Sequence, residues 1–371
     1  MIKVCHITTV HKPFDTRIFY KECISLAKKG YQVSLIAQHK TDEVIHNIRI
    51  LHIPFAGNRI KRMLSLSRYV LQRAIEVDAQ VYHFHDPELI PIGLKLKRLG
   101  KKVIYDVHED YFASILEKKY IPKYLRWIVA VGFELYEKIV CRNFDYVIAA
   151  TPHIKKRFEG KAKRIIDIQN MPLPDEFENV HIDWTNKEKG ICYVGGISRS
   201  RGLDTILNLA SMLERSHDEM KNVKVYLAGE FLDGKLIEIT KNFRNIVYLG
   251  FLDRNGIAEL FNRCIAGLVF FHPEPNNVNS MPTKMFEYMS WGIPVIASDF
   301  PLWKEIVENI GCGFCVNPFD TEKIYQIVKF LVSNIDKARE MGIKGRQAVI
   351  QKYNWSVEER KLLKIYDDLL N

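Results

Sequence analysis

Several features that define membrane and secreted proteins are missing from this chain of 371 residues. No uninterrupted apolar run reaches the ~18 residues that a membrane-spanning helix needs. The start, MIKVCHITTV, lacks the charged region, apolar stretch and small-residue cleavage site of a signal peptide. The seven cysteines, an odd number scattered along the chain, suit a reducing compartment. We therefore expect a cytoplasmic protein.

Common motifs for nucleotides, metals and nucleic acids are missing as well. The absence of GxGxxG and GxxxxGK[ST] argues against dinucleotide-binding and P-loop sites. Cys312 and Cys315 form a CxxC, but no second pair follows, and GCGFCVNP resembles a turn entering a strand, which favours a structural role. The net charge of +10 favours anionic partners. Without a zinc pattern, RNP-like aromatic motif or basic tail, we expect no nucleic acid among them.

Strand-like apolar runs alternate with helix-like segments from end to end. This alternation is typical of βαβ units around a parallel sheet, so the fold class is predicted to be α/β. In the first half the strand-like runs are 2–10, 31–37, 81–85, 102–108 and 145–150, with a predicted helix at 15–29. In the second half they are 190–196, 223–229, 246–250, 266–271 and 294–298. We predict two α/β domains of similar size, with a linker near 169–188.

The richest loop of the second half is HPEPNNVNSMPTKMFEYMSWGIPV, which follows a strand-like run. Pro282 suits the first turn of a helix capped by Ser280 or Asn279, and such a start is a natural diphosphate seat. Lys284 in that turn would gain from a nearby phosphate, and Glu287 could accept the two hydroxyls of a ribose. From charge spacing alone, an ordinary salt bridge between Lys284 and Glu287 is favoured over a ligand site.

Another loop with phosphate-binding character, GISRSRGLDTIL, follows the run 190–196. Gly195 and Gly196 permit close approach of the backbone, while Arg199 and Arg201 precede a predicted helix. Glycines and arginines at a helix start suit a phosphate. A glycine turn with solvated arginines fits the same residues equally well.

Two predicted strand ends of the first half carry histidines, in VYHFHDPEL and IYDVHEDY. A histidine and a carboxylate there would suit a polar substrate pocket, whereas core or loop histidines fit each position equally well. A metal site of His85, Asp86, His108 and Glu109 would have no fixed ligand spacing on one element, so no metal site is predicted.

The segment PTKMFEYMSWGIPVIAS resembles the nucleotide-sugar-binding segment of retaining glycosyltransferases of the GT-B fold, family four (group 1). HKPFDTRIFYKECISLAKKGYQVSLIA and KVIYDVHED resemble its bacterial envelope and capsular polysaccharide members, and YVGGISRSRGLDTIL, VYLAGE and VYLGFLD follow in the family's order. The resemblance covers nearly the whole chain. It implies two facing Rossmann-like domains with parallel sheets: 1–170 for the acceptor, 171–354 for the nucleotide sugar, and 355–371 as a last helix crossing back to the first domain.

The resemblance also implies roles for single residues. Glu287 matches the glutamate that binds the donor ribose, whereas Asn279 replaces a glutamate that touches the donor sugar. Gly196 replaces an arginine and Arg201 a lysine beside the diphosphate, and Lys284 would restore the missing charge. His108 matches the histidine of the reaction centre. The other candidate site residues are Gly195, Glu230 and Thr283 for the nucleotide sugar, and Asp15, Arg17, His85 and Glu109 for the acceptor pocket.

The implied activity is transfer, with retention, of a hexose or hexosamine-type sugar from a nucleotide sugar, expected to be UDP-linked. The implied acceptor is a glycan or a lipid-linked molecule in envelope polysaccharide synthesis, and neither cofactor nor metal is expected. Segment 58–74 is basic and partly amphipathic, and segment 117–131 places basic residues near aromatic ones. Both suit the anionic inner face of the plasma membrane as well as solvated helix faces. A UDP-sugar 2-epimerase of the same fold is the alternative function.

Overall fold

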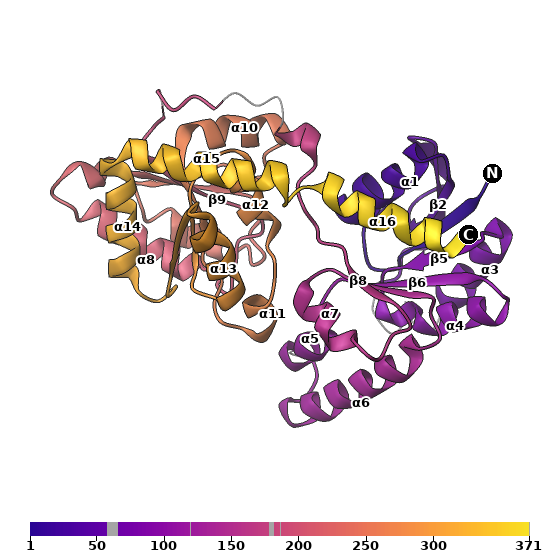
Figure 1. Ribbon diagram of the computed structural model, residues 1–371. Coiled ribbons are helices and arrows are strands. Elements are labelled where there is room, and N and C mark those ends of the chain that lie inside the picture. Colours follow the sequence, from indigo (N-terminus) through magenta and orange to yellow (C-terminus); the bar gives the residue numbers. More distant parts are fainter. Residues whose placement is uncertain (58–65, 119, 178–181, 186, 371) are drawn as a thin grey trace. The chain divides into compact units, whose positions relative to one another are not determined.

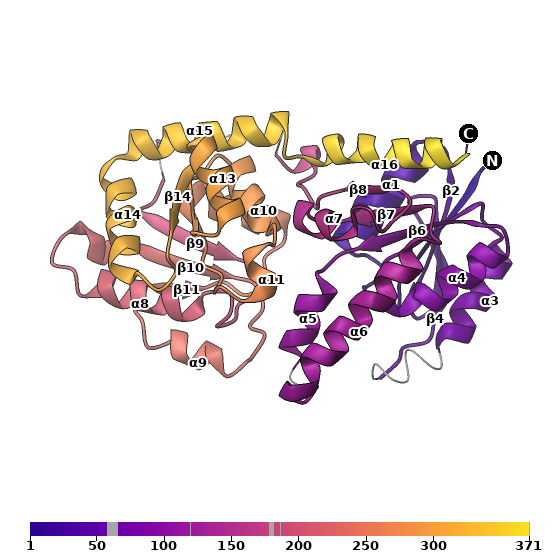
Figure 2. The ribbon, with the colours of Figure 1, turned by 60° about the horizontal axis from the view of Figure 1, so that its bottom comes forward.

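The computed structural model divides the chain into two compact units, Met1–Asn170 with Trp355–Asn371, and Met171–Asn354. It describes residues 1–57, 66–118, 120–177, 182–185 and 187–370. Each unit, called here the first and the second domain, is a Rossmann-like α/β domain with helices on both faces of a sheet (Figures 1 and 2). The α/β class and the parallel sheets predicted from the strand pattern are confirmed.

The first domain is built on an eight-stranded sheet in the order β3-β4-β2-β1-β5-β6-β7-β8. All neighbours are parallel except β3 and β4, which form an antiparallel pair at the edge that the sequence did not predict. The chain order reverses between β1 and β5, and ligands of such sheets bind at this switch point. The strands are β1 Lys3–Ile7, β2 Gln32–Gln38, β3 Glu43–Ile45, β4 Ile48–Ile53, β5 Val81–Phe84, β6 Lys102–Val107, β7 Tyr146–Ala149 and β8 Ile165–Asp167.

The second domain has a six-stranded parallel sheet in the order β11-β10-β9-β12-β13-β14. Its switch point lies between β9 and β12, so the loops that follow these two strands are the expected ligand site. The strands are β9 Gly190–Val194, β10 Lys224–Ala228, β11 Ile246–Tyr248, β12 Cys264–Val269, β13 Val295–Ser298 and β14 Gly313–Val316.

Helices cover both faces of each sheet (Figure 1). Those of the first domain are η1 Thr16–Cys23, α1 Ile24–Lys28, α3 Ser67–Val77, η3 Pro87–Leu89, α4 Ile90–Arg98, α5 Tyr111–Glu117, α6 Lys123–Cys141, α7 Pro152–Phe158 and α16 Trp355–Leu370. Those of the second are η4 Pro174–Glu176, α8 Leu203–Glu214, η5 Glu219–Asn222, α9 Leu236–Thr240, α10 Arg254–Arg263, α11 Pro275–Val278, α12 Thr283–Ser290, α13 Pro301–Ile310, α14 Thr321–Ser333 and α15 Ile335–Gln351.

The helix predicted at 15–29 differs from a regular α-helix. Its first part, η1, is a π-helix, and only α1 is α-helical. Asp15 caps η1, because its side chain accepts the backbone N–H groups of Arg17 and Ile18. Three charged side chains of η1 are buried, namely Arg17, Lys21 and Glu22. Long π segments are rare and often occur at functional sites.

The helix at the end of the chain completes the first domain. Nε1 of Trp355 at the start of α16 donates to Oγ of Ser25 at 2.9 Å. Near its end, Tyr366 is fully buried, and Asp368 accepts the hydroxyl of Tyr146 at 2.9 Å. The helix packs on the same sheet face as η1 and α1, so residues from the two ends of the chain share one core (Figure 1).

The prediction of a linker near 169–188 is wrong in part. Met171 and Phe177 are 1% exposed and belong to a hydrophobic core of the second domain. This core lies under α10, α12 and α13, and a second core on the other sheet face lies under α8 and α14. The segment therefore enters the second domain soon after Asn170.

Candidate active site

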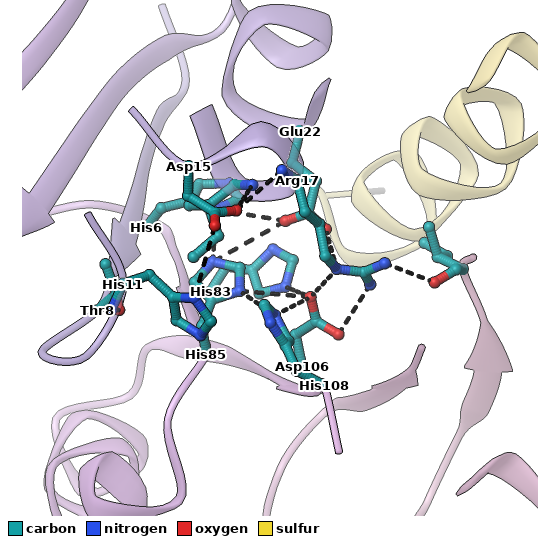
Figure 3. Close-up of polar contacts among 12 residues, drawn as sticks. His6, Thr8, His11, Asp15, Arg17, Glu22, His83, His85, Asp106 and His108 are labelled. Atoms are coloured by element: carbon teal, nitrogen blue, oxygen red, sulfur yellow. Dashed lines mark hydrogen bonds and ion pairs between the residues drawn. The ribbon is translucent and has the colours of Figure 1, made fainter. Parts of the chain in front are cut away.

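Three buried histidines lie at the switch point of the first domain (Figure 3). His6 on β1 and His83 on β5 are partners in the parallel register, so they point to the same face of the sheet. His85 follows β5, and all three side chains are 0% exposed. The ring centroid of His83 lies 4.5 Å from that of His6 and 4.6 Å from that of His85. The three imidazoles thus form one cluster between the sheet and the helices η1 and α16.

Asp106 on β6 joins this cluster to the surface. Its Oδ1 and Oδ2 accept Nη2 and Nε of Arg17 at 2.9 and 3.0 Å, and Nη1 of Arg17 donates to the Ile168 carbonyl at 2.7 Å. Nε2 of His108 lies 3.1 Å from Oδ2. Burial would raise the pKa of Asp106, but the Arg17 guanidinium and His108 hold it well below its usual range. Asp106 is therefore an ionised acceptor for His108.

A continuous chain of short contacts leads inward from His108. Its Nε2 lies 3.1 Å from Nδ1 of His85, and Nε2 of His85 lies 3.0 Å from Nδ1 of His6. The Tyr366 hydroxyl lies 3.2 Å from Nε2 of His6 and 2.9 Å from Nδ1 of His83. Burial lowers the pKa of His85 to about 4, and those of His6 and His83 well below the usual value. Neutral imidazoles each offer one donor and one acceptor, so alternating tautomers account for these contacts and leave Nε2 of His83 without a hydrogen-bond partner among the described residues.

Asp86, directly after His85, fixes the loop that follows β1. Its Oδ2 accepts the hydroxyl of Thr8 at 2.9 Å, the N–H of Thr9 at 2.6 Å and the N–H of Val10 at 3.3 Å. Two loops at the switch point are thereby tied together. The carboxylate of Asp86 thus accepts hydrogen bonds from backbone N–H groups and from a threonine hydroxyl.

The predicted acceptor-pocket residues lie in different environments. Arg17 and His85 are buried within the cluster, and Asp15 caps η1. Glu109 is exposed in the turn after β6. His108 keeps 11% of its side chain exposed, and its ring centroid lies 4.7 Å from that of His11, a neighbour that the sequence analysis missed.

A buried lysine marks the switch point of the second domain. Lys284 in α12 is 7% exposed, and among the described residues its ammonium has no hydrogen-bond partner. Nζ lies 3.6 Å from the centroid of the Tyr193 ring and 3.1 Å from the position that a Cβ on Gly195 would occupy. Burial and the charge of Arg201 lower the pKa of Lys284 well below its usual value, with Glu287 opposing. A buried cation without a partner is costly, so the arrangement favours an anionic ligand.

The loop after β9 brings the predicted glycines next to Lys284. Gly195 has a φ of +116°, which favours glycine, and its N–H donates to the carbonyl of Ala228 at 2.8 Å. A Cβ at Gly196 would lie 2.6 Å from Nη1 of Arg201, so glycine leaves room for the guanidinium to fold over the loop. Glu230 has an exposed side chain, and its carbonyl accepts the N–H of Ile197 at 2.8 Å. Lys284 thus approaches Gly195, and Arg201 approaches the next residue, Gly196.

The start of α12 differs from the prediction. Pro282 occupies the capping position with a ψ of 124°, one residue before the helix, and no side chain in the described part of the chain caps α12. Ser280 instead bonds the carbonyl of Asn277 at 2.8 Å, and Asn279 ends α11. Pro282 was therefore placed one residue too far into the helix, and Ser280 and Asn279 are not its caps. An uncapped helix start keeps backbone N–H groups for an anion.

Thr283 and Glu287 lie on α12 one turn apart. Thr283 is its first residue, and Glu287 is half-buried three residues after Lys284. Spacing of three residues places Lys284 and Glu287 on the same helix face. The two side chains are therefore neighbours at one end of the sheet.

Two family models match the chain almost end to end. The one described as glycosyl transferases group 1 matches residues 175–348, and the one described as glycosyltransferase family 4 matches residues 5–170. The chain belongs to the group 1 glycosyl transferases. This finding favours the transferase over the 2-epimerase considered from the sequence.

The glycosyltransferase is similar in sequence to two curated proteins. It is 23% identical over 281 residues to an uncharacterized 41.2 kDa protein in the cps region of Klebsiella pneumoniae, covering 73% of this chain and 75% of that protein. It is 21% identical over 356 residues to a phosphatidyl-myo-inositol mannosyltransferase of Mycobacterium leprae, covering 91% and 88%.

Solved structures share the fold of the glycosyltransferase. Sucrose-phosphate synthase from Thermosynechococcus elongatus matches with a TM-score of 0.78 at 17% identity, covering 100% of this chain and 99% of that one. HepE from Anabaena, solved in complex with UDP-glucose, matches with a TM-score of 0.73 at 14% identity, covering 99% and 100%. These matches confirm the GT-B class of two Rossmann-like domains.

Two further sequence expectations concern cysteines and membranes. All seven cysteines are free, and β14 carries Cys315, in agreement with a structural CxxC. None of the helices in the described part of the chain is long and apolar enough to cross a membrane. The basic segment 58–74 lies partly outside the described residues, because 58–65 are not among them.

Proposed function

We propose that this glycosyltransferase transfers a hexose or hexosamine-type sugar, with retention, from a UDP-sugar to a glycan or lipid-linked acceptor of the cell envelope. The observation that carries the donor half of the proposal is the buried ammonium of Lys284, which approaches Gly195 without a hydrogen-bond partner among the described residues. A diphosphate would supply the missing negative charge.

In the proposed mechanism, the chain's own cations stabilise the departing diphosphate. Lys284 lies next to Gly195 and Arg201 next to Gly196, and the start of α12 adds backbone N–H groups and a positive dipole end. Donors fixed in advance around developing charge are among the largest contributions to catalysis. These groups would neutralise the diphosphate without a metal at the donor site. Glu287 would hold the ribose hydroxyls and Asn279 a hydroxyl of the sugar.

His108 is proposed to orient the donor sugar or its reacting edge. It is the partly exposed end of the histidine chain, and Asp106 fixes the direction of its Nε2. Holding reacting groups in place is a large part of the catalytic task in such a transfer.

The proposal of an envelope acceptor at a membrane rests on relatives and on α6. One relative is encoded in a cps region, and another is a phosphatidyl-myo-inositol mannosyltransferase. On α6, Tyr124, Trp127 and Ile128 are 78%, 63% and 60% exposed, next to Lys123 and Arg126. Exposed aromatics beside basic residues suit an anionic lipid surface. Trp127→Ser with Ile128→Ser should reduce flotation with anionic liposomes, and no binding of the parent chain would refute this part.

The donor is tested by calorimetry and the stereochemistry by NMR. UDP should bind the parent chain, and binding should weaken in Lys284→Met but not in Lys344→Met, an exposed control. For retention, the anomeric configuration of the first product formed should equal that of the donor, and an inverted product would contradict the proposal. Incubation without acceptor should yield no epimer of the nucleotide sugar.

A further inference from the structure

The first domain contains buried polar atoms whose hydrogen-bonding capacity is not met by the described residues. They are both carboxylate oxygens of Glu22 and Nε2 of His83, and both side chains are 0% exposed. Oε1 of Glu22 does lie 3.1 Å from Nε of Arg17, but that N–H donates to Asp106, so the contact is an ion pair. Buried groups of this kind are rare and indicate a missing partner.

These atoms converge on the ring nitrogens of two further buried histidines. Nδ1 of His6 and Nε2 of His85 lie 3.0 Å apart, and Oε2 of Glu22 lies 3.8 Å from the first and 3.9 Å from the second. In the plane of these three atoms, the point at equal distance from all of them lies about 2.1 Å from each, the length of a Zn–N or Zn–O bond. A ligand atom of His83 lies within 4.8 Å of all of them.

Four buried side chains, those of Glu22 and of the histidines at positions 6, 83 and 85, each have a polar partner for the end that faces away from this point. Nδ1 of His85 lies 3.3 Å from Oδ2 of Asp106, and the Tyr366 hydroxyl serves both His6 and His83, as described above. Oε1 of Glu22 faces Arg17. Such outer partners fix the tautomer and direction of metal-binding histidines and carboxylates.

We propose that His6, His83, His85 and Glu22 bind one Zn²⁺ ion that stabilises the first domain. Three imidazoles and one carboxylate are ligands that suit Zn²⁺, and a buried set of four protein ligands is typical of a structural site rather than a catalytic one. The ligands come from β1, η1, β5 and the residue that follows β5, so the ion would join the π-helix to the two central strands. This group differs from the one weighed from the sequence, because only His85 is common to both.

The site has a competing state without metal, in which Glu22 carries a proton. Burial raises the pKa of Glu22 well above its usual range, and the neighbouring charge of Asp106 adds to the rise. Zn²⁺ would have to displace this proton, so its affinity should fall as the pH is lowered.

The test uses the full chain without a histidine tag, freed of metal with a chelator. Zn²⁺ is titrated against a chromophoric chelator, and Co²⁺ is added as a spectroscopic probe. We expect one equivalent to bind, a rise in melting temperature that depends on Zn²⁺ concentration, and visible absorption of tetrahedral Co²⁺. Glu22→Gln and His83→Gln should each lower the affinity at least about tenfold, and Tyr366→Phe by about tenfold.

The control removes two histidines that face carboxylates nearer the surface. His39 contacts Glu43 and His52 contacts Asp42, so these pairs are two places where Zn²⁺ could bind weakly. The double variant His39→Gln, His52→Gln should keep the single strong site. Loss of Zn²⁺ binding in that variant, or no tetrahedral Co²⁺ spectrum in the parent chain, would overturn the proposal even if the buried variants fail to fold. None of these measurements depends on UDP binding by the second domain. Failure of the zinc proposal can therefore be told apart from failure of the donor proposal.

Discussion

Nε2 of His108 and Nε of Arg17 meet the same oxygen, Oδ2 of Asp106, at 3.1 and 3.0 Å. One carboxylate therefore orients the histidine proposed for the reaction centre and neutralises a buried guanidinium. Arg17 is 4% exposed, so its charge depends on this partner and on Glu22. Stability of the first domain and the geometry of His108 are linked through Asp106.

Replacing Asp106 should therefore unfold the first domain more easily. Asp106→Asn leaves Arg17 with an incomplete partner in a buried site, and loss of one member of such a pair costs about 3–5 kcal/mol. Urea unfolding measures the loss. Asp78→Asn, which breaks an exposed pair with Lys101, is the control and should cost no more than about 1 kcal/mol. Equal effects of the two substitutions would show that Arg17 does not depend on Asp106.

His108 should affect turnover far more than stability. We expect His108→Ala to lower kcat by about 100-fold or more, since misplacement of reacting groups has effects of that size. The affinity for UDP should stay unchanged, because the donor-site residues named above lie in the second domain. His153→Ala, at a half-exposed histidine of the same domain, is the matched control. Full turnover by His108→Ala would exclude a role in the reaction.

Lys284 should affect the binding of UDP without lowering the stability of the fold. Lys284→Met keeps the volume of the side chain and removes a buried charge, so the free energy of unfolding is expected to stay the same or rise, even though the contact with the Tyr193 ring is lost. The dissociation constant of UDP should increase at least about tenfold, as expected for a lost charge-assisted contact. Calorimetry and urea unfolding of the same samples measure both. A less stable variant with unchanged affinity would assign Lys284 to the fold alone.

A substitution at Gly196 should displace the side chain of Arg201 without replacing that residue. A Cβ at this position would lie 2.6 Å from Nη1 of Arg201, the far end of a flexible side chain, so Gly196→Ala should displace the guanidinium at little cost to the fold. We expect weaker UDP binding with a melting temperature within a few degrees of the parent. Gly234→Ala, where no atom lies within 4 Å, should change neither quantity. Unchanged UDP affinity in Gly196→Ala would mean that the present position of Arg201 does not matter.

The buried histidines predict a loss of stability in mild acid. In the chain freed of metal, the folded-state pKa of His85 is about 4, whereas an unfolded histidine titrates near 6.5, so the unfolded chain binds more protons between these values. Stability should therefore fall as the pH drops below about 6.5, by up to about 1.4 kcal/mol per pH unit for each such histidine. Glu22 opposes the trend below its raised folded pKa. Urea unfolding at several pH values should give a smaller slope for His83→Asn than for the parent, and an equal slope would refute the assignment.

The sequence predicted the parallel strands well, because apolar runs that are separated by helical segments are typical of strands buried on both faces. It missed β3 and β8, which have three residues each and lie at the two edges of the sheet, and it missed β4, the neighbour of β3. The π register of η1 could not be predicted, since the apolar pattern of 15–29 fits an α-helix equally well.

The candidate site was predicted in part. Gly195, Arg201, Lys284 and Glu287 lie near one switch point, where glycines and charges at strand ends had placed them. The burial of Lys284 was not predictable, because a lysine in a first helical turn is usually solvated. The histidine cluster was missed because His6, Glu22 and Tyr366 are brought together only by the sheet register and by α16.

The position of α16 in the sequence has a consequence for synthesis on the ribosome. The first domain is translated first, yet Trp355 and Tyr366, which fill its core and contact Ser25 and His6, are translated after the whole second domain. Part of this sheet face, beside η1 and α1, therefore stays uncovered in the nascent first domain until the second domain has been made. A chain interrupted between the two events would expose that face to chaperones and proteases, while its second domain could already be folded.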